Sequence, residues 1–413
     1  MTRDSQLPIP NSQLPIPNSQ LPRKALIVGA GIGGLAAALA LRRAGWDVRV
    51  FERAASPREL GFALLLAPNA MHALGALGLA EVARRGGAIA TNGEMRRPDG
   101  TVLRRFDTAA ARALLDEDAV CILRTVLHGA LLDAVGLDTV ALGSAVTGFT
   151  TSHEGVELTM ANGRTVTGDI LVGADGVGSL IRNQLHPHEG ALRRSGLLAI
   201  RGVALDEVHH LGNASGVQYF GRGFEAGVAR AGEREVYWYM SLRADQLARR
   251  SLGGGGFPID FGTPAALAER CASRFHEPFR AIVRATRAED LRLDELFERD
   301  PIDDWGAGRV TLLGDAAHPM LPHAGQGAAQ ALEDAVALGH VLRDTTPADA
   351  ALRRYERARA ARTRAVVQLA KRNARMGSIK SAAGCWMRDL VIRLVPESVI
   401  LKSLVALGRP PSP

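Results

Sequence analysis

Residues 24–52 read KALIVGAGIGGLAAALALRRAGWDVRVFE, an order of apolar runs and glycines that is typical of one kind of fold. The first apolar run predicts a buried strand, the Ala- and Leu-rich run predicts a helix, and a second apolar run predicts a strand that ends at Glu52. Between the first strand and the helix, Gly29, Gly31 and Gly34 form the pattern G-x-G-x-x-G. This order predicts a βαβ unit of a parallel sheet that binds a dinucleotide.

Each glycine of this turn has its own physical task. Gly29 makes the tight turn, Gly31 lets the backbone approach a pyrophosphate, and Gly34 lets the helix pack on the strand. Glu52 follows about 20 residues later, at the position where a carboxylate binds an adenosine ribose. Because all these features occur in the expected order, we favour a dinucleotide site over a glycine-rich helix start.

A second informative stretch, residues 314–334, reads GDAAHPMLPHAGQGAAQALED. A short aliphatic strand precedes it and an Ala-rich helix follows it. Pro319, Pro322 and Gly325 shape the backbone of the turn. The free amides at the helix start near Gly327 favour a negative charge. The stretch therefore predicts a site for an anionic group.

The composition limits the classes of function. With 413 residues, of which 46% are hydrophobic, the chain is long enough for two domains that share an interface. The formal net charge is +7, but the arginines are scattered and form no basic arm, so nucleic-acid binding is not indicated. Cys121, Cys271 and Cys385 lack metal-ligand spacing and predict free thiols in a reducing cytoplasm, with no metal site.

The two ends of the chain differ from its centre. Residues 5–22 repeat SQLPIPN, whose prolines predict a disordered extended tail. The N-terminus lacks the apolar core of a signal peptide, and the uncharged stretch 25–41 is better explained as strand plus helix than as a membrane span. Residues 386–407 could touch a membrane or a lipophilic substrate, but charged interruptions favour packing on the body as a helical pair. We therefore expect no membrane association.

Coarse secondary structure completes the prediction. Residues 68–85 and 121–135 are expected to be helices, and Asn162-Gly163 is expected to form a tight hairpin turn. A β-rich block is expected over 197–242, and a long Arg-rich helix lies within 347–404.

The predicted fold class is α/β, with a Rossmann-like nucleotide-binding domain assembled from discontinuous segments, an inserted β-rich substrate domain and C-terminal helices. Ligands of such folds bind at the carboxyl ends of the strands, between the two parts. The predicted division is: tail, 1–22; nucleotide-binding domain, 23–86, 120–192 and 300–345; substrate domain, 87–119 and 193–299; C-terminal helical segment, 346–413.

A third motif, GADGVGSLIR at 173–182, lies between the other two. Taken in order, the three motifs resemble those of the single-component FAD-dependent aromatic hydroxylases, the para-hydroxybenzoate-hydroxylase-like flavoprotein monooxygenases. The amino-acid sequences of the motifs are most similar to those of the branch that contains salicylate, 3-hydroxybenzoate and urate hydroxylases and zeaxanthin epoxidase. The resemblance covers about residues 23 to 400.

The resemblance implies a monooxygenase that uses FAD, with NADH or NADPH as transient reductant. A flavin C4a-hydroperoxide would transfer one oxygen atom from O2 to an aromatic or other electron-rich small molecule. The resemblance implies a small aromatic or lipophilic substrate and a cytoplasmic monomer or homodimer.

The resemblance also assigns residues to the cofactor. Asp315 matches the carboxylate that bonds the ribityl chain, and Arg124 matches an arginine near the phosphates. The helix start at 327–329 would stabilise the charge of reduced flavin, although this chain has Ala329 where many relatives have Asn. The full predicted set is Gly29, Gly31, Gly33, Gly34, Glu52, Arg53, Gly61, Arg124, Asp175, Gly176, Arg182, Asp315, Gly325, Gly327 and Ala328.

The substrate side is less specific. Pro322 is expected beside the reactive flavin carbon, and His323 is the candidate hydrogen-bond acceptor or base for a phenolic substrate. Arg201 could bind a substrate carboxylate or phenolate. Tyr219 and Tyr239 could line the pocket. For each of these residues an ordinary loop, surface or core role stays open.

Two alternative functions retain the same cofactor fold. An FAD-dependent reductase would keep the FAD motifs without oxygen transfer, and a non-catalytic protein could bind flavin and sequester a ligand. Oxygenated product formed during substrate-stimulated NAD(P)H oxidation separates the monooxygenase from both.

Overall fold

A five-stranded parallel sheet forms the centre of the nucleotide-binding part, with strand order β18-β12-β1-β2-β8. The computed structural model describes residues 23–56, 62–245, 263–343 and 347–410. The strands are β1 (Lys24–Val28), β2 (Asp47–Phe51), β8 (Val140–Ala141), β12 (Ile170–Gly173) and β18 (Val310–Leu312).

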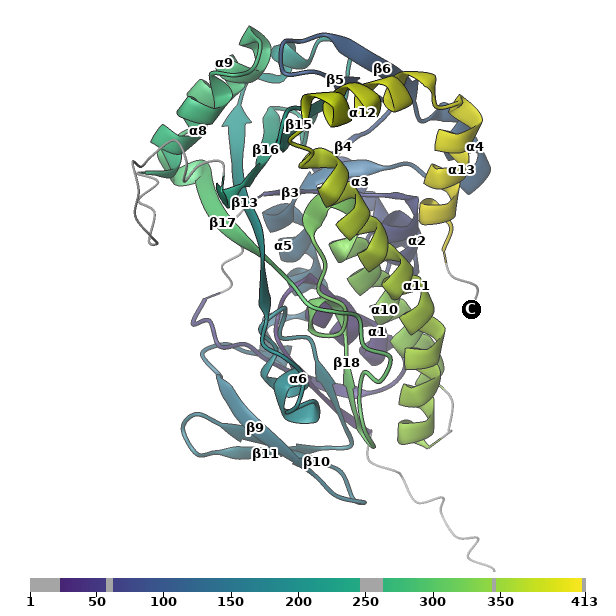
Figure 1. Ribbon diagram of the computed structural model, residues 1–413. Coiled ribbons are helices and arrows are strands. Elements are labelled where there is room, and N and C mark those ends of the chain that lie inside the picture. Colours follow the sequence, from purple (N-terminus) through teal and green to yellow (C-terminus); the bar gives the residue numbers. More distant parts are fainter. Residues whose placement is uncertain (1–22, 57–61, 246–262, 344–346, 411–413) are drawn as a thin grey trace, which may run out of the picture.

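Helices cover this sheet because β1 and β12 are apolar at almost every position and must be buried on both faces. Helices α1 (Ile32–Arg43) and α10 (Gly327–Val341) pack so closely that a Cβ on Gly339 would lie 2.8 Å from that of Ala40. Helix α5 (Arg124–Val135) adds to the same core. A small antiparallel sheet at the bottom of Figure 1 is formed by β9 (Val146–Thr151), β10 (Val156–Met160) and β11 (Thr165–Gly168).

A seven-stranded sheet, in the order β17-β13-β16-β15-β14-β5-β6, forms the second large layer. Its outer face packs under helices α8 (Pro264–Ala272) and α9 (Glu277–Ala285), and its inner face looks toward the nucleotide-binding part (Figure 1). The strands are β5 (Asn92–Arg96), β6 (Val102–Asp107), β13 (Arg193–Leu205), β14 (Gly216–Phe220), β15 (Phe224–Arg230), β16 (Glu235–Arg243) and β17 (Leu291–Glu298).

Two of the predicted helices need correction. The stretch 68–85 is broken into α2 (Pro68–Ala76) and α3 (Ala80–Gly86), because Gly78 adopts a left-handed φ of +70° between them. Residues 120–123 form strand β7 (Val120–Leu123), which pairs with β3 (Ala63–Leu66) and β4 (Gly87–Ile89), so only 124–135 is helical. The shorter helices α4 (Ala109–Leu115) and α6 (Leu180–Leu185) complete this half, and the hairpin at Asn162-Gly163 is confirmed.

Three helices end the chain. Helix α11 (Ala348–Gly377) crosses the front of the molecule in Figure 1, and α12 (Ala382–Leu394) and α13 (Glu397–Gly408) follow it. Of α12 only Arg388, Asp389 and Ile392 are buried, and of α13 only Gly408. The expected helical pair does form and packs on the body, α13 against α4 and α2 and α12 through Ile392, but most large apolar residues of α12 stay exposed. No helix in the described ranges is long and apolar enough to cross a bilayer.

Candidate active site

The three sequence motifs meet at one edge of the parallel sheet. Residues 28, 173 and 312 are neighbours in the register of the adjacent strands β1, β12 and β18, and each motif begins at the end of its strand or within two residues of it. Because the strands are parallel, their carboxyl ends lie side by side, where ligands of doubly wound sheets bind.

In the turn after β1, a side chain would clash with the backbone at Gly29 and Gly34 but would find open space at Gly31. Gly29 has a φ of +103°, and a Cβ there would lie 2.4 Å from the carbonyl oxygen of Ala174. A Cβ on Gly34 would lie 1.9 Å from the carbonyl oxygen of Gly29. At Gly31 a Cβ would meet no described atom within 4 Å. The turn therefore leaves a cradle at Gly31, as a pyrophosphate requires, whereas Gly33 contacts Leu313.

Two side chains clamp the turn at Ala30. The backbone N–H of Ala30 donates to Oε2 of Glu52 over 2.9 Å, and Nε2 of His128 lies 2.7 Å from the carbonyl oxygen of Ala30. Glu52 is half-buried, and its other oxygen accepts from the backbone of Ala54 at 2.9 Å. Arg53 is exposed beyond the strand end. His128 was not predicted, because a lone histidine on an apolar helix carries no distinctive signal.

The second turn, after β12, is a capped strand-to-helix connection. Asp175 accepts from the backbone N–H groups of Leu180, over 2.7 Å, and Ile181, over 3.2 Å, at the start of α6. Burial raises the pKa of Asp175, although hydrogen bonds from Ser179 and the backbone oppose this shift. Gly176 takes a φ of +79° and has open space where a Cβ would lie. The turn is rigid, and contact of Asp175 and Gly176 with a cofactor stays a prediction.

Arg182 corrects the sequence prediction that it binds the cofactor directly. Its guanidinium is fully buried, and Nη1 donates to the carbonyl oxygens of Ala316, over 3.0 Å, and Ala317, over 2.8 Å. The remaining N–H groups donate to Glu189 and to the carbonyl oxygen of Asp300. All five donors of the side chain are used within the protein. Arg182 therefore acts by holding the turn after β18.

That third turn brings Asp315 to the start of α10. Asp315 is accessible to solvent, and the protein atoms around its carboxyl group raise the pKa of that group. The interactions of this carboxyl group with His318 and Arg124 oppose the rise. A Cβ on Gly327 would lie 3.9 Å from Oδ1 of Asp315.

The N-terminus of α10 keeps its positive dipole end available. The side chain of the capping residue, Gln326, accepts a hydrogen bond from Asn69 over 3.0 Å and bonds none of the helix amides. The first helical turn holds no acidic residue. Gly325, before it, adopts a left-handed φ of +62°. The amides of Gly327 and Ala328 can therefore stabilise a negative charge beside Asp315.

A buried ion-pair network, which the sequence did not predict, fixes this turn from behind. Asp334 accepts from the backbone N–H of Gly314, over 3.0 Å, and from Nε of Arg359, over 2.7 Å. Nε2 of His318 lies 2.6 Å from the same carboxylate. Arg359 also donates to Glu333 and to Gln330. Two features of the sequence could have revealed this network: the adjacent acids Glu333 and Asp334 inside an Ala-rich helix, and Arg359 on the next helix.

The inner face of the seven-stranded sheet supplies polar side chains opposite the turn. Arg201 pairs with Tyr239 in the register of β13 and β16, and Ser241 pairs with Glu225 across β16 and β15. Since side chains alternate along a strand, these four residues share one face. Tyr219 lies on the other face, 2% exposed, packed against Phe275 and Phe279. Its assignment to the substrate pocket is wrong.

His323 reaches this face from the turn before α10. Its Nε2 lies 3.0 Å from Oγ of Ser241 and 3.7 Å from Oε1 of Glu225. Burial lowers the pKa of His323 to about 4, with a further contribution from the charge of Arg201, and burial raises the pKa of Glu225 to about 8. Nδ1 of His323 is buried and lacks a hydrogen-bond partner among the described residues. Near neutral pH His323 is therefore uncharged and has one ring nitrogen free.

Arg201 is only weakly paired. Its nearest carboxylate, that of Asp294, is 3.8 Å away, and its guanidinium lies 5.7 Å from the centroid of the Phe62 ring. Its charge opposes the rise in the pKa of Tyr237 that burial causes, so Arg201 and Tyr237 are close. Tyr239 donates from its hydroxyl to Gln218 over 2.8 Å. A cation and tyrosine hydroxyls thus lie on the same inner face.

The residues at the strand ends fit FAD. The cradle at Gly31, the carboxylate of Asp315 and the uncapped start of α10 match the pyrophosphate, the ribityl chain and the electron-rich flavin edge. Pro322 is exposed at the start of a short 3₁₀ turn, where it is available to a ligand. Gly61 lies outside the described residues.

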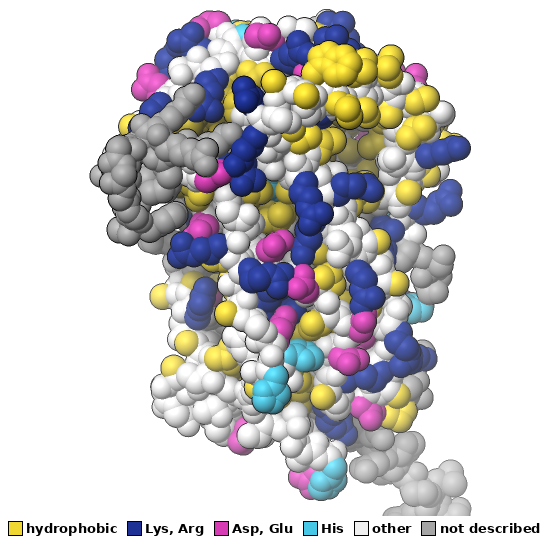
Figure 2. All heavy atoms as spheres, in the orientation of Figure 1, with side chains coloured by type: hydrophobic (Ala, Val, Ile, Leu, Met, Phe, Trp, Pro, Cys, Tyr) yellow, Lys and Arg dark blue, Asp and Glu magenta, His cyan; other side chains and the backbone are white. Residues whose placement is uncertain are grey.

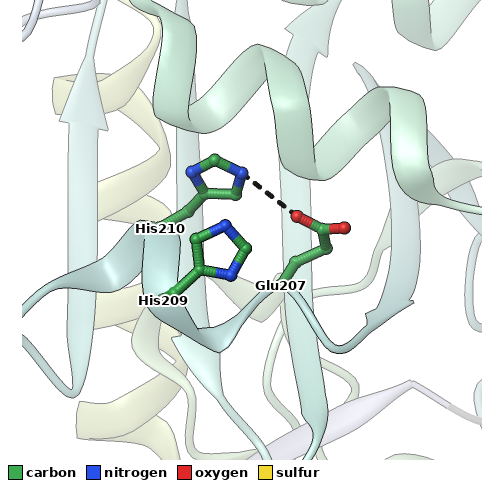
Figure 3. A group of neighbouring side chains, drawn as sticks. All are labelled: Glu207, His209 and His210. Atoms are coloured by element: carbon green, nitrogen blue, oxygen red, sulfur yellow. Dashed lines mark ion pairs between the residues drawn. The ribbon is translucent and has the colours of Figure 1, made fainter.

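One cluster has the residue types of a metal site, although none was expected. The ligand atoms of Glu207, His209 and His210 lie within 4.8 Å of one another (Figure 3). The Glu207 carboxylate already pairs with His210 over 3.1 Å. The cluster contacts α9, on the outer side of the sheet, and therefore takes no part in the site described above.

Comparison with known proteins agrees with this geometry. The family model described as FAD binding domain matches residues 23–370. The chain is 34% identical over 370 residues to the aurachin C monooxygenase/isomerase of Stigmatella aurantiaca, covering 90% of this chain and 94% of that protein. It is 34% identical over 354 residues to 3-hydroxybenzoate 6-hydroxylase 1 of Aquipseudomonas alcaligenes, with 82% and 85% covered.

The fold has a solved counterpart. The crystal structure of Klebsiella pneumoniae HpxO, complexed with FAD and uric acid, superimposes with a TM-score of 0.86 at 26% identity. The match covers 94% of this chain and 96% of that one. The chain therefore belongs to the FAD-binding-domain family of flavoprotein monooxygenases.

Proposed function

We propose that this FAD-dependent monooxygenase inserts one oxygen atom of O2 into a small aromatic substrate that carries an acidic hydroxyl or carboxyl group. NADH or NADPH is the reductant. The substrate lies between the turn that holds Pro322 and His323 and the inner face of the seven-stranded sheet. Hydroxylation, decarboxylative hydroxylation and epoxidation share this arrangement.

One observation carries the proposal. Incompletely paired polar groups from two distant parts of the chain meet at one place, since His323 contacts Ser241 of the sheet and senses the charge of Arg201. The same short turn leads directly into the uncapped start of α10 beside Asp315. A substrate held by the sheet would therefore lie next to a flavin held by the helix.

Protein groups at the carboxyl ends of the strands would hold FAD and stabilise its charge. Bound FAD supplies electron transfer and oxygen activation, and the protein supplies position, charge and exclusion of water. Gly29, Gly31 and Glu52 would hold the ADP half, and Asp315 would accept hydrogen bonds from the ribityl hydroxyls. The amides of 327–329 would stabilise negative charge on the flavin as an oxyanion hole does. Arg124 would add positive charge beside Asp315.

On the substrate side, three groups would divide the work. Arg201 would bind the carboxylate or phenolate and favour the anionic form of the substrate. In the tautomer with the proton on Nε2, His323 would donate to Ser241, and Nδ1 would accept a hydrogen bond from a substrate hydroxyl. Because burial keeps the pKa of His323 near 4, the ring stays a neutral acceptor at physiological pH. Tyr239 would border the ring.

The wider assignments remain part of the proposal. We infer that residues 87–119 and 193–299 act as the substrate domain, because strands from both segments share the seven-stranded sheet. We also infer a cytoplasmic enzyme that works as a monomer or homodimer and has no nucleic-acid partner.

The test is a screen of NADH and NADPH oxidation by the FAD-loaded enzyme against phenols, quinolones, purines and polyenes, with the mass of each product recorded. We expect at least one aromatic acid or phenol both to stimulate oxidation and to gain one oxygen atom. Stimulated oxidation with a hydrogenated product would indicate the reductase alternative. Stoichiometric FAD with no turnover across the panel would indicate a flavin- or ligand-binding protein.

A further inference from the structure

Helix α12 has an inverted arrangement of side chains. Its buried side carries the charged Arg388 and Asp389 beside Ile392, and its outer side carries a stripe of large apolar residues. In a helix that packs on a protein core the apolar side is the buried one. The stripe consists of Trp386, Met387, Leu390, Val391 and Leu394.

The exposure of this stripe is large. Trp386, Met387, Val391 and Leu394 expose between 55% and 70% of their area, and Leu390 exposes 37%. Their spacing of i, i+1, i+4, i+5 and i+8 places all five on one helical face. Figure 2 shows hydrophobic side chains gathered at the top of the molecule, over α12. Contiguous exposed apolar surface of this kind marks an interaction site.

The orientation of α12 is fixed by its buried side. Nη1 of Arg388 donates to the carbonyl oxygen of Gly221 over 2.8 Å, and Nη2 donates to that of Phe220 over 3.2 Å. Asp389 accepts from Nε of Arg97 over 2.7 Å. Arg388 and Asp389 also pair with each other, with Nη2 of Arg388 2.9 Å from Oδ1 of Asp389. Rotation of the helix to bury the stripe would break the bonds to Gly221, Phe220 and Arg97, so these bonds hold the apolar face outward.

Positive charge accompanies the stripe. Over the described residues 386–410 the exposed cations are Arg393, Lys402 and Arg409, against one exposed carboxylate, that of Glu397. Arg393 follows Leu390 by three positions and therefore borders the stripe. A surface of anionic lipid headgroups supplies the opposite charge.

We propose that the apolar face of α12 docks on an anionic lipid surface. The tryptophan and the aliphatic side chains enter the interface between headgroups and acyl chains, and Arg393, on the same helix, contacts the headgroups. This replaces the expectation of no membrane association, which assumed that these side chains pack on the body. Docking is peripheral, since no described helix can cross a bilayer.

Docking would also bring the substrate side close to the lipid, a consequence that rests on the proposed function. Arg388 binds the turn between β14 and β15, and Glu225, two residues after Gly223 of that turn, faces His323. The lipid-facing helix is therefore the next layer beyond the proposed pocket. A lipophilic aromatic substrate could reach the pocket from the bilayer.

Sedimentation with vesicles tests the proposal on the FAD-loaded enzyme. Vesicles of phosphatidylcholine alone are compared with vesicles that contain phosphatidylglycerol, at low and high salt. We expect binding to the anionic vesicles that weakens with salt and falls roughly 10- to 100-fold in Trp386→Ser/Leu394→Ser. The matched control, Leu137→Ser/Leu205→Ser, also removes two exposed leucines and should bind as wild type does.

Three results would overturn the proposal: no binding to either vesicle, equal binding by the Trp386/Leu394 variant, or binding that ignores lipid charge and salt. Light scattering provides a further check. A wild-type dimer that the same substitutions dissociate would show that a second copy covers α12. Since neither measurement uses turnover, a failed docking test leaves the monooxygenase assignment unaffected.

Discussion

Two buried clusters of acids and bases lie on either side of the turn before α10, and they differ in how completely their groups are paired. Behind the turn, Asp334 is bonded by His318, Arg359 and the backbone of Gly314. In front of it, Glu225 and His323 lie 3.7 Å apart with few partners.

The pKa shifts express this difference. Burial alone would raise the pKa of Asp334, but the charges and hydrogen bonds of His318 and Arg359 hold it below its usual value. Burial dominates in the front cluster, where it raises the pKa of Glu225 to about 8 and lowers that of His323 to about 4. Paired groups stay ionised and fix the scaffold, whereas sparsely paired groups become neutral and remain available to a ligand.

The largest effect is expected behind the turn. Arg359→Met should lower the free energy of unfolding by about 3–5 kcal/mol, because it leaves the carboxylates of Glu333 and Asp334 buried and underpaired. Urea unfolding measures this change. The control is Arg287→Ala, which removes an exposed pair with Asp290 and should leave the free energy of unfolding nearly unchanged. If the two substitutions lowered the free energy of unfolding equally, the buried pairs of Arg359 would contribute no more to stability than an exposed pair does.

Glu225 should make the folded protein sensitive to alkaline pH. Its folded pKa of about 8 lies above the unfolded value, so its contribution to stability is complete below about pH 4.5 and is lost as the pH rises through 8. Glu225→Gln should therefore be more stable than wild type at pH 8 by roughly 2–4 kcal/mol, and the difference should shrink toward pH 5. Unfolding curves at both pH values test this, with exposed Glu289→Gln as the control.

A difference between Glu225→Gln and wild type that does not change with pH would show that Glu225 is already ionised in the folded protein. The contribution of His323 to stability depends on pH in the opposite direction. Because its folded pKa is depressed, its contribution is present above about pH 6.5 and is lost as the pH falls toward 4.

Asp315→Ala should affect the ligand and not the fold. Loss of the carboxylate that faces the start of α10 should weaken FAD binding by about 10- to 100-fold, while circular dichroism stays as in wild type. Titration of the apo-protein with FAD measures the affinity. Asp206→Ala, which removes an exposed carboxylate paired with Arg234, is the control. Unchanged FAD affinity in Asp315→Ala would contradict the ribityl assignment.

The two faces of the seven-stranded sheet give the smallest and most selective prediction. Tyr239→Phe, on the inner face, should lower kcat/KM by about 10-fold, whereas Tyr219→Phe, on the outer face, should leave kcat/KM unchanged. The hydroxyl of Tyr219 lies 2.8 Å from Nε2 of His276, so this substitution should cost about 1 kcal/mol of stability instead. If Tyr219→Phe lowered kcat/KM and Tyr239→Phe did not, the substrate would lie on the outer face, under α9.

The sequence predicted the nucleotide-binding part well because its information is local. The glycines at 29, 31 and 34 and the turn at 314–327 specify backbone shapes that few sequences can adopt, and strand order then brings them together. The prediction failed where the answer depends on partners far away in the chain. Arg182 resembles a ligand-binding arginine until the fold brings Ala316 and Ala317 to its guanidinium.

The sequence also did not predict which face of a strand or helix each side chain occupies. Tyr219 and Tyr239 both lie in strands, and a pattern of mixed apolar and polar residues does not reveal which face is inward. The register of β14 with β15, and of β15 with β16, decides this. Likewise, the charged residues in 386–407 predicted packing on the body but did not reveal the buried side, where Arg388 and Asp389 lie because Gly221 and Arg97 pair with them.

The most direct test of the central claim is turnover of the FAD-loaded enzyme under ¹⁸O2 with NADH or NADPH and the aromatic substrate that the screen identifies. The mass of the product then shows the origin of the added atom. Our account predicts one ¹⁸O atom in the product, with the label absent when ¹⁸O is supplied only in water. A product without label, or labelled from water, would contradict the assignment of this chain as a flavin-dependent monooxygenase.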